Sequence, residues 1–393
     1  MSGLRVAPAA LLRGDGAIEA LAAHLAAGAP SVLLVHGPVG YPVVRGRLDA
    51  ALADAGVRAV RELHEGPCTV PAIDALAASA ARQGVQAVLG VGGGRVLDAA
   101  KGAALATGLP FVALPTSPAT CAATAATVVR YDERGAHLDV LEGGPVAAAC
   151  AIDPGLLASA PDRLLAAGVV DAWAKVHEVR LTSARAGANG TAGGAGAEGA
   201  AGAGAAASAT TRAALALLDD LAELLRDHAL DALAAGPSGG RDPSRLPQRH
   251  LVAEAVVAYP GLIGGLAGAD AKLALAHPLH DALTHLPGAH AALHGEMVGF
   301  GTLVQLRVAG LDRRADEDGR VAAFRDEAAR YAALGVRCHL EALGCGDARA
   351  APTEAAVVRR ALADPAVASA LPALGFDALL AAVREVDAWV RKA

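Results

Sequence analysis

Short apolar runs alternate with amphipathic stretches between residue 31 and about residue 153. The stretch at 43–55 has the spacing of a helix, and the apolar runs predict buried strands. The predicted strands cover residues 31–35, 58–63, 87–91, 111–114 and 148–152. Strands that alternate with helices form right-handed βαβ units, and the near-continuous apolar character of these strands is typical of a parallel sheet covered on both faces.

After Pro154 the strand pattern ends and helical periodicity continues to the C-terminus. The clearest predicted helices cover 156–170, 171–182, 211–230, 254–276 and 295–308. Residues 184–210 are almost entirely Gly, Ala, Ser and Thr, which favours a flexible insertion over an alanine-rich helix, because each internal glycine costs about 1 kcal/mol relative to alanine. We therefore expect a Rossmann-like α/β domain at 1–157 and an all-α domain at 158–393.

Composition removes several classes of protein. Alanine supplies much of the 54% hydrophobic content, and no run of roughly 18 large apolar residues or signal-peptide core is present. The formal net charge of −6 is spread along the chain, which argues against a nucleic-acid partner. The five cysteines are scattered without CxxC spacing, which suits the cytoplasm. We expect a cytoplasmic protein with neither a membrane nor a nucleic-acid partner.

The segment 87–101 has the pattern of an anion site. An apolar strand leads into Gly92, Gly93 and Gly94, and a helix follows at once with Asp98 in its expected first turn. Glycines let a pyrophosphate approach the backbone, and the free amides of a helix N-terminus attract it. A glycine turn before a helix is also common without any ligand.

Hydroxyl and thiol side chains follow the predicted strand at 111–114. Thr116, Ser117, Thr120, Cys121 and Thr124 come directly after it. Loops at the carboxyl ends of parallel strands carry ligands in open α/β sheets, although turn and cap chemistry accounts for such residues equally well.

Asp171, His277 and His294 form a second constellation. Asp171 is expected to open the helix at 171–182, with Lys175 and Glu178 on the same face. His277 is expected to end the helix at 254–276 before Pro278, and His294 to precede the helix at 295–308. One carboxylate and two imidazoles suit Zn²⁺ or Fe²⁺ with an open position, although nearby histidines leave the ligand set open. The other histidines of this region are His280, His285 and His290.

With these motifs together, the chain resembles the iron-containing alcohol dehydrogenase/glycerol dehydrogenase superfamily, which shares its fold with dehydroquinate synthase. The resemblance runs from about Arg5 to Leu306, apart from residues 184–210. It rests on Gly92–Gly94 with Asp98 and Lys101, on Pro115-Thr116, on 167–171, on 276–280, and on His294-Gly295-Glu296.

The resemblance implies an NAD(P)-linked oxidoreductase that binds one divalent metal through Asp171, His277 and His294. Lys175 stands where many iron-type members carry a fourth ligand, which favours zinc over iron. We further expect catalytic roles for His280, as a proton relay, and for Cys121, beside the substrate. The alternatives are a capping or solvated role for His280 and a buried, inert thiol at Cys121. The implied cofactor-binding residues are Gly37, Gly92, Gly93, Gly94, Arg95, Asp98, Thr116, Ser117, Thr127 and Tyr131.

Two positions depart from the glycerol dehydrogenase pattern. Cys121 replaces an Asp that bonds the polyol, so the chain resembles the hydroxycarboxylate dehydrogenase branch, and glycerol is disfavoured. Gly37 stands where NAD-specific members usually have an Asp on the ribose, so NADP(H) is admissible beside NAD(H).

The expected function is therefore metal-dependent oxidation of a hydroxy acid or secondary alcohol by a homo-oligomer. One alternative is oxidation of the C-terminal threonine of a ribosomal peptide, followed by decarboxylation, as in daptide-type pathways. A dehydroquinate-synthase-like cyclase and a non-catalytic metal-binding relative are alternatives from other classes. Net production of NAD(P)H would distinguish the dehydrogenases from both.

Overall fold

Six parallel strands form the central sheet of the N-terminal part. The computed structural model describes residues 4–6, 8–141, 144, 146–191, 208–268, 273–309 and 317–392. The sheet has the order β1-β8-β5-β4-β2-β3, with every neighbouring pair parallel. Its strands are β1 (Leu11–Arg13), β2 (Ser31–His36), β3 (Arg58–Leu63), β4 (Ala87–Gly92), β5 (Phe111–Pro115) and β8 (Ala149–Ile152).

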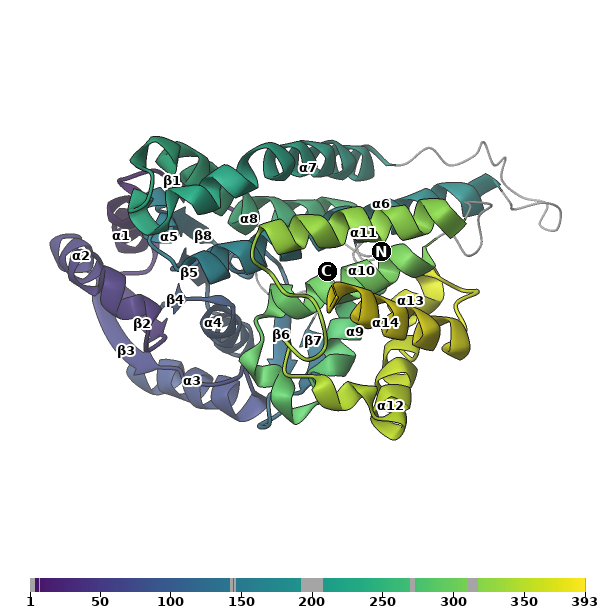
Figure 1. Ribbon diagram of the computed structural model, residues 1–393. Coiled ribbons are helices and arrows are strands. Elements are labelled where there is room, and N and C mark those ends of the chain that lie inside the picture. Colours follow the sequence, from purple (N-terminus) through teal and green to yellow (C-terminus); the bar gives the residue numbers. More distant parts are fainter. Residues whose placement is uncertain are drawn as a thin grey trace.

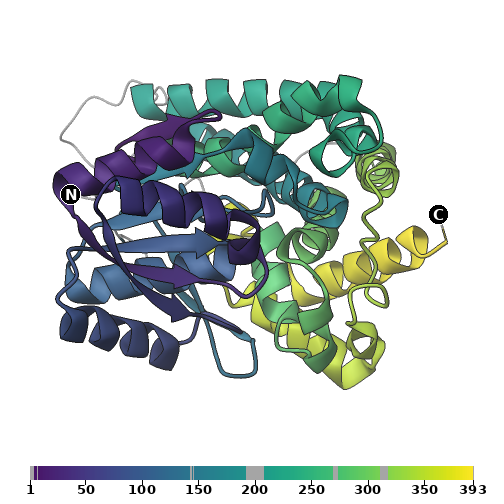
Figure 2. The same cartoon turned by 90° about the vertical axis from the view of Figure 1, so that its left-hand side faces the viewer.

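Helices cover both faces of this sheet, as Figure 2 shows. Successive side chains of a strand point to opposite faces. Val32 and Leu34 of β2 therefore pack with α1 (Ala17–Gly28) and α2 (Gly40–Asp54). Leu33 and Val35 pack on the other face with α3 (Val70–Gln83) and α4 (Gly94–Thr107). This second layer continues into the buried core of the helical part.

The predicted α/β architecture is confirmed, and each predicted strand lies within one residue of an observed one. The sequence pattern missed β1 and the antiparallel hairpin of β6 (Val128–Tyr131) and β7 (His137–Leu141). These strands have three to five residues, and only Val128 among them is buried, so they lack the apolar run that marks a central strand.

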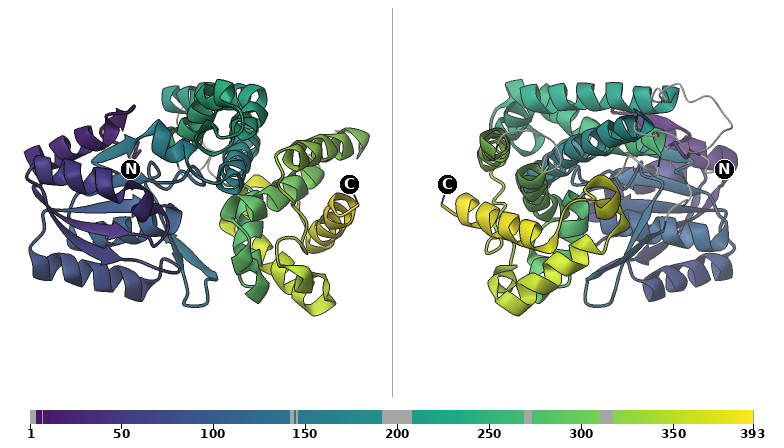
Figure 3. Two further views of the ribbon diagram at one scale, coloured as in Figure 1. Left: turned by 60° about the vertical axis from the view of Figure 1, so that its left-hand side comes forward. Right: turned by 90° about the vertical axis from the view of Figure 1, so that its right-hand side faces the viewer.

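No strand follows Ile152 in the described residues, and helices make up the rest of the chain (Figures 1 and 3). The α-helices are α5 (Pro154–Ala158), α6 (Asp162–Thr191), α7 (Ala209–Ala235), α8 (Leu246–Ala267), α9 (Ala276–Leu283), α10 (His294–Val308), α11 (Glu317–Ala333), α12 (Ala351–Leu362), α13 (Pro365–Ala370) and α14 (Phe376–Val390). Short 3₁₀ helices lie at Pro237–Gly239, Pro243–Arg245, Pro287–Ala291 and Gly346–Arg349.

Two of the predicted helix boundaries that are wrong concern candidate ligands. Asp171 lies inside the continuous helix α6 rather than at the start of a helix, because buried alanine and valine residues on both sides of it keep the helix going. His277 is the second residue of α9, not the end of α8. Pro278 lies in the first turn of α9, where a missing N–H costs no hydrogen bond.

The expected insertion at 184–210 is helical at both margins, since α6 continues to Thr191 and α7 begins at Ala209. Residues 192–207 lie outside the described part of the chain. The predicted domain boundary at 157/158 stays a prediction.

Among the described residues, one helical segment is long and apolar enough to cross a bilayer. It is Pro243–Ala267, which joins the 3₁₀ turn Pro243–Arg245 to α8. Half of its apolar window is buried inside the molecule, and it packs against α7. Val252 and Val257 are fully buried there. This burial is typical of a core helix.

Candidate metal and cofactor site

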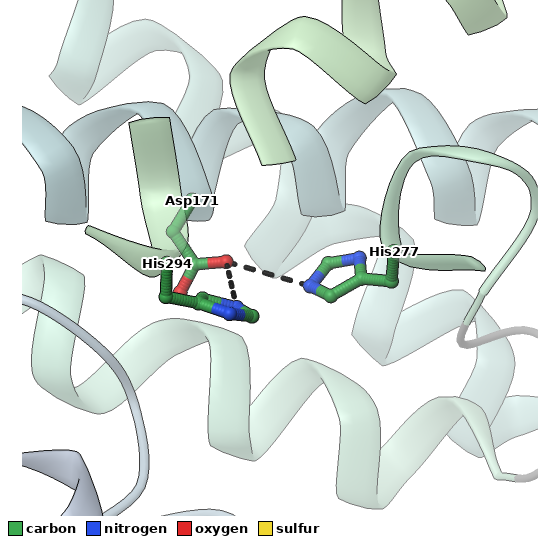
Figure 4. Close-up of side chains that lie close together, drawn as sticks. All are labelled: Asp171, His277 and His294. Carbon is green, nitrogen blue, oxygen red and sulfur yellow. Dashed lines mark ion pairs between the residues drawn. The ribbon is translucent and has the colours of Figure 1, made fainter. Parts of the chain in front are cut away.

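The three predicted ligand side chains converge from three different helices, as Figure 4 shows. Asp171 comes from α6, His277 from α9 and His294 from α10. The Asp171 Oδ1 atom lies 3.5 Å from His277 Nε2 and 3.3 Å from His294 Nε2. In a tetrahedral zinc site, bonds of about 2.0–2.1 Å leave neighbouring ligand atoms about 3.3 Å apart. The donor set and its spacing therefore fit a divalent metal.

Close packing of helix backbones brings these ligands together. A Cβ atom at Gly295 would overlap the carbonyl oxygen of Ala167, so α10 touches the backbone of α6 one turn before Asp171. Similarly, a Cβ atom at Gly168 would overlap the carbonyl oxygen of Pro118, in the loop after β5. The absence of side chains at these two glycines thus sets the approach of α10 and of the loop to Asp171.

Glu178 orients the imidazole of His277 through Nδ1, the ring nitrogen that does not face Asp171. Its side chain is fully buried, and Oε2 lies 2.6 Å from His277 Nδ1. The other oxygen, Oε1, accepts hydrogen bonds from the backbone N–H groups of Ala274 (3.0 Å) and His277 (3.2 Å). An ionised carboxylate only accepts, so it favours the tautomer with a proton on Nδ1 and a lone pair on Nε2 toward Asp171.

His280 supports His294 in a similar way. His280 Nε2 lies 3.1 Å from His294 Nδ1, and His280 Nδ1 lies 2.8 Å from Asp281 Oδ1. The second carboxylate oxygen of Asp281 is 3.7 Å from Nδ1 of His137 in β7. Both ring nitrogens of His280 therefore have partners, which gives it a positioning role for His294, and the proton relay stays a prediction.

The two carboxylates dominate the electrostatics of the ligand cluster. Burial raises the pKa of Asp171, but the imidazoles of His294 and His277 outweigh burial and hold it well below its usual value. Burial lowers the pKa of His277, yet Glu178 and Asp171 raise it to about 9. Burial and then His294 lower the pKa of His280 to about 4. The site thus stabilises a positive charge beside Asp171, and it would stabilise a bound metal cation for the same reason.

The predicted cofactor residues meet at the carboxyl edge of the sheet. A Cβ atom at Gly37, after β2, would lie 3.0 Å from Cγ2 of Val96 in α4, and one at Gly92 would lie 2.7 Å from Val96 Cβ. The N–H of Thr116 donates to the carbonyl of Gly92 (3.1 Å). A Cβ atom at Gly93 would lie 3.3 Å from Ser117 Oγ. The ends of β2, β4 and β5 therefore adjoin one glycine-lined turn.

The expected position of Asp98 in the first turn of a helix is wrong. Asp98 is the fifth residue of α4, and its buried carboxylate lies 3.5 Å from Nζ of the fully buried Lys101. Burial raises the pKa of Asp98 to about 6 despite Lys101. Lys101 Nζ also donates to the carbonyls of Ala122 and Thr127, both at 2.8 Å. The pair anchors the loop that carries Cys121.

The remaining candidates surround this loop. Thr127 contributes its carbonyl to Lys101, Arg95 is exposed on α4, and Tyr131 lies partly buried in β6. Burial raises the pKa of the Cys121 thiol to about 11, and the charges of Asp171 and Lys175 also act on it. Cys121 therefore lies within electrostatic range of the ligand cluster.

Two supporting residues were missed by the sequence interpretation. The sequence pattern places Glu178 only on the face of Asp171 and predicts no role for Asp281. For Asp281 the signal is its place beside His280 in the sequence. For Glu178 the signal is only a carboxylate on an apolar helix, which needs a partner when buried, because its partner His277 is 99 residues away.

The comparisons with known proteins agree on one family. Residues 8–154 match the family model of iron-containing alcohol dehydrogenases. The chain is 31% identical to a glycerol dehydrogenase of Escherichia coli O6:H1, over 76% of this chain and 75% of that protein. It is 29% identical to hydroxycarboxylate dehydrogenase A of Escherichia coli K12, over 71% and 70%. A crystal structure of a probable glycerol dehydrogenase from Sinorhizobium meliloti superposes with a TM-score of 0.76 and 27% identity, covering 98% of both chains.

Proposed function

This chain belongs to the iron-containing alcohol dehydrogenase family, and we propose that it is a metal-dependent, NAD(P)-linked dehydrogenase of a hydroxy acid or secondary alcohol. The observation that carries the proposal is the convergence of Asp171, His277 and His294 from three helices. An oxidoreductase of this family is the shared conclusion of the comparisons. The metal, the cofactor and the substrate class are our proposal.

In this proposal Asp171, His277 and His294 hold one divalent metal, with zinc favoured because no fourth ligand accompanies them in the described cluster. A metal held there supplies Lewis-acid polarisation of an alcohol or carbonyl oxygen. Glu178 keeps His277 in the binding tautomer. His280, held by Asp281, does the same for His294.

The glycine turn at Gly92–Gly94 would receive the pyrophosphate of NAD(P), because bare backbone and the start of α4 lie there. The nicotinamide supplies the hydride acceptor, and the protein supplies orientation. Thr116 and Ser117 would bond the cofactor from the neighbouring loop.

The surroundings of Cys121 favour an anionic substrate. The thiol carries no charge at neutral pH, since burial raises its pKa to about 11. The Asp171 carboxylate, which the metal would neutralise, and then the Lys175 ammonium act on the same position. A hydroxycarboxylate would be attracted by that ammonium, whereas an aspartate here would repel it. The C-terminal carboxylate of a peptide offers the same chemistry. A homo-oligomer in the cytoplasm remains our expectation.

The test is a substrate panel with purified protein loaded with Zn²⁺ or Fe²⁺. Hydroxy acids, secondary alcohols, glycerol and a peptide ending in threonine are each supplied with NAD⁺ and NADP⁺, and the reduced cofactor is followed by absorbance. Small hydroxy acids should give net reduced cofactor and glycerol little. A cyclase would regenerate its cofactor, so consumption of a substrate without net reduced nicotinamide would refute the proposal.

A further inference from the structure

Unpartnered polar atoms gather between α6 and α11, on the side of α6 away from Asp171. Trp173 lies two residues after Asp171, and at about 100° per residue it projects from the opposite side of the helix. Five of the ten buried side-chain atoms without a hydrogen-bond partner in the described part of the chain lie here: Trp173 Nε1, His177 Nε2, Glu327 Oε1, Arg330 Nε and the Tyr331 hydroxyl. Buried polar atoms in native proteins almost always have a partner, so this cluster indicates a place for a ligand.

A small cavity between α6, α7 and α11, the helices in the upper part of Figure 1, adjoins this cluster. Trp173 and Arg330 line the cavity, and each carries one of the unpartnered nitrogens. The cavity volume is about 30 Å³. A water-sized particle needs about 10–15 Å³ of such space. The cavity therefore admits a monatomic ion but not a nucleotide or a sugar.

We propose that this cavity binds a halide ion, chloride or bromide. Arg226 on α7 and Arg330 on α11 line it, and none of its described lining residues is acidic. Trp173 is only 5% exposed, and its indole N–H can donate but not accept, so its partner must be an acceptor. A halide is an acceptor that carries negative charge. The site lies outside the metal cluster and does not depend on the proposed function.

The charges around the cavity suit an anion. The guanidinium carbon of Arg330 lies 4.6 Å from the centroid of the Trp173 ring, which holds this cation against α6. Glu327 does not line the cavity, and its Oε2 lies 3.5 Å from Arg330 Nε and 3.6 Å from His177 Nε2. Among the residues of the cavity and the cluster, two arginines thus face one glutamate, and an anion would offset the remaining positive charge.

The test is a bromide titration of the zinc-loaded full chain, with sodium gluconate holding the ionic strength constant. Bromide quenches the emission of an indole that it contacts, and the chain has two tryptophans, Trp173 and Trp389. Trp389→Phe therefore leaves only the emission of Trp173. We expect its quenching to saturate, and the melting temperature to rise with chloride or bromide but not with gluconate, because a ligand of the native state stabilises it.

Two variants in the Trp389→Phe background alter the cavity in different ways. Arg330→Gln should weaken bromide binding about 10-fold or more, because it removes a charged donor. Ala229→Val changes no charge but fills part of the cavity, since Ala229 lines it, and should remove the saturable quenching. Arg325→Gln is the matched control, because it loses the same charge from α11 without lining the cavity. It should leave bromide binding unchanged.

Three results would overturn the halide site. Quenching of Trp173 that rises linearly without saturation would mean that the cavity holds only water. Equal weakening by Arg325→Gln and Arg330→Gln would show an effect of general charge. Saturable quenching that is unchanged in Ala229→Val would place the ion elsewhere, for example on the metal, and would leave the dehydrogenase proposal standing.

Discussion

Replacing Glu178 with glutamine should weaken zinc binding without removing any candidate ligand. The carboxylate accepts three hydrogen bonds, two at Oε1 from backbone N–H groups and one at Oε2 from His277 Nδ1. A glutamine has nearly the same shape but only one acceptor oxygen. If that oxygen faces the backbone donors, the NH₂ group faces Nδ1 and favours the tautomer with a proton on Nε2, which cannot bind a metal.

The size of the effect follows from this mismatch. Loss of such a supporting carboxylate typically reduces metal affinity 10- to 100-fold. At about 1.4 kcal/mol per tenfold, this corresponds to about 1.4–2.8 kcal/mol of binding free energy. Because Glu178 is fully buried and its contact is 2.6 Å, we expect the upper part of this range.

The assay is a zinc titration against a chromophoric chelator at pH 7.5, together with the melting temperature of each metal-free variant. Glu327→Gln is the control, because Glu327 is also a buried carboxylate beside a histidine, 3.6 Å from His177, but does not contact the ligand cluster. A folded Glu178→Gln protein whose zinc affinity stays within about threefold of wild type would refute the reasoning.

Three further predictions concern the ligands and Cys121. Replacing Asp171, His277 or His294 with alanine should in each case abolish stoichiometric metal binding, measured by elemental mass spectrometry. A full metal complement in His277→Ala would exclude His277 as a ligand. Cys121→Asp should suppress turnover of hydroxy acids by charge repulsion, and a folded variant with an unchanged substrate profile would show that the substrate does not reach this loop. In chelator-treated protein, Cys121 should react with iodoacetamide at pH 8 at least about 100-fold more slowly than a free cysteine, because burial raises its pKa to about 11 and leaves correspondingly less thiolate. The rate should rise with pH up to that value. The other four cysteines are buried, so the label reports on Cys121, and an ordinary rate at pH 8 would contradict this assignment.

The hydrophobic pattern of the sequence predicted those strands and helices that the residues of a short segment determine by themselves. Strands β2, β4, β5 and β8 were predictable because a buried strand must be apolar along its length, and the edge strand β3 was predictable from its place in the alternation of strands and helices. The identities of Asp171, His277 and His294 came from motif resemblance together with donor chemistry. The hairpin of β6 and β7 could not be predicted, since its short, partly exposed strands are stabilised by pairing with each other.

Tertiary structure alone decided how the ligands meet and what supports them. Residues 171, 277 and 294 are far apart in the chain, and their side chains converge because glycines let α10 and the loop after β5 touch the backbone of α6. The same packing brings Glu178 against His277 and Asp281 behind His280. The sequence gives the identity of each side chain. Which imidazole nitrogen presents a lone pair to a metal depends on hydrogen-bond partners that only the packing of the helices brings together.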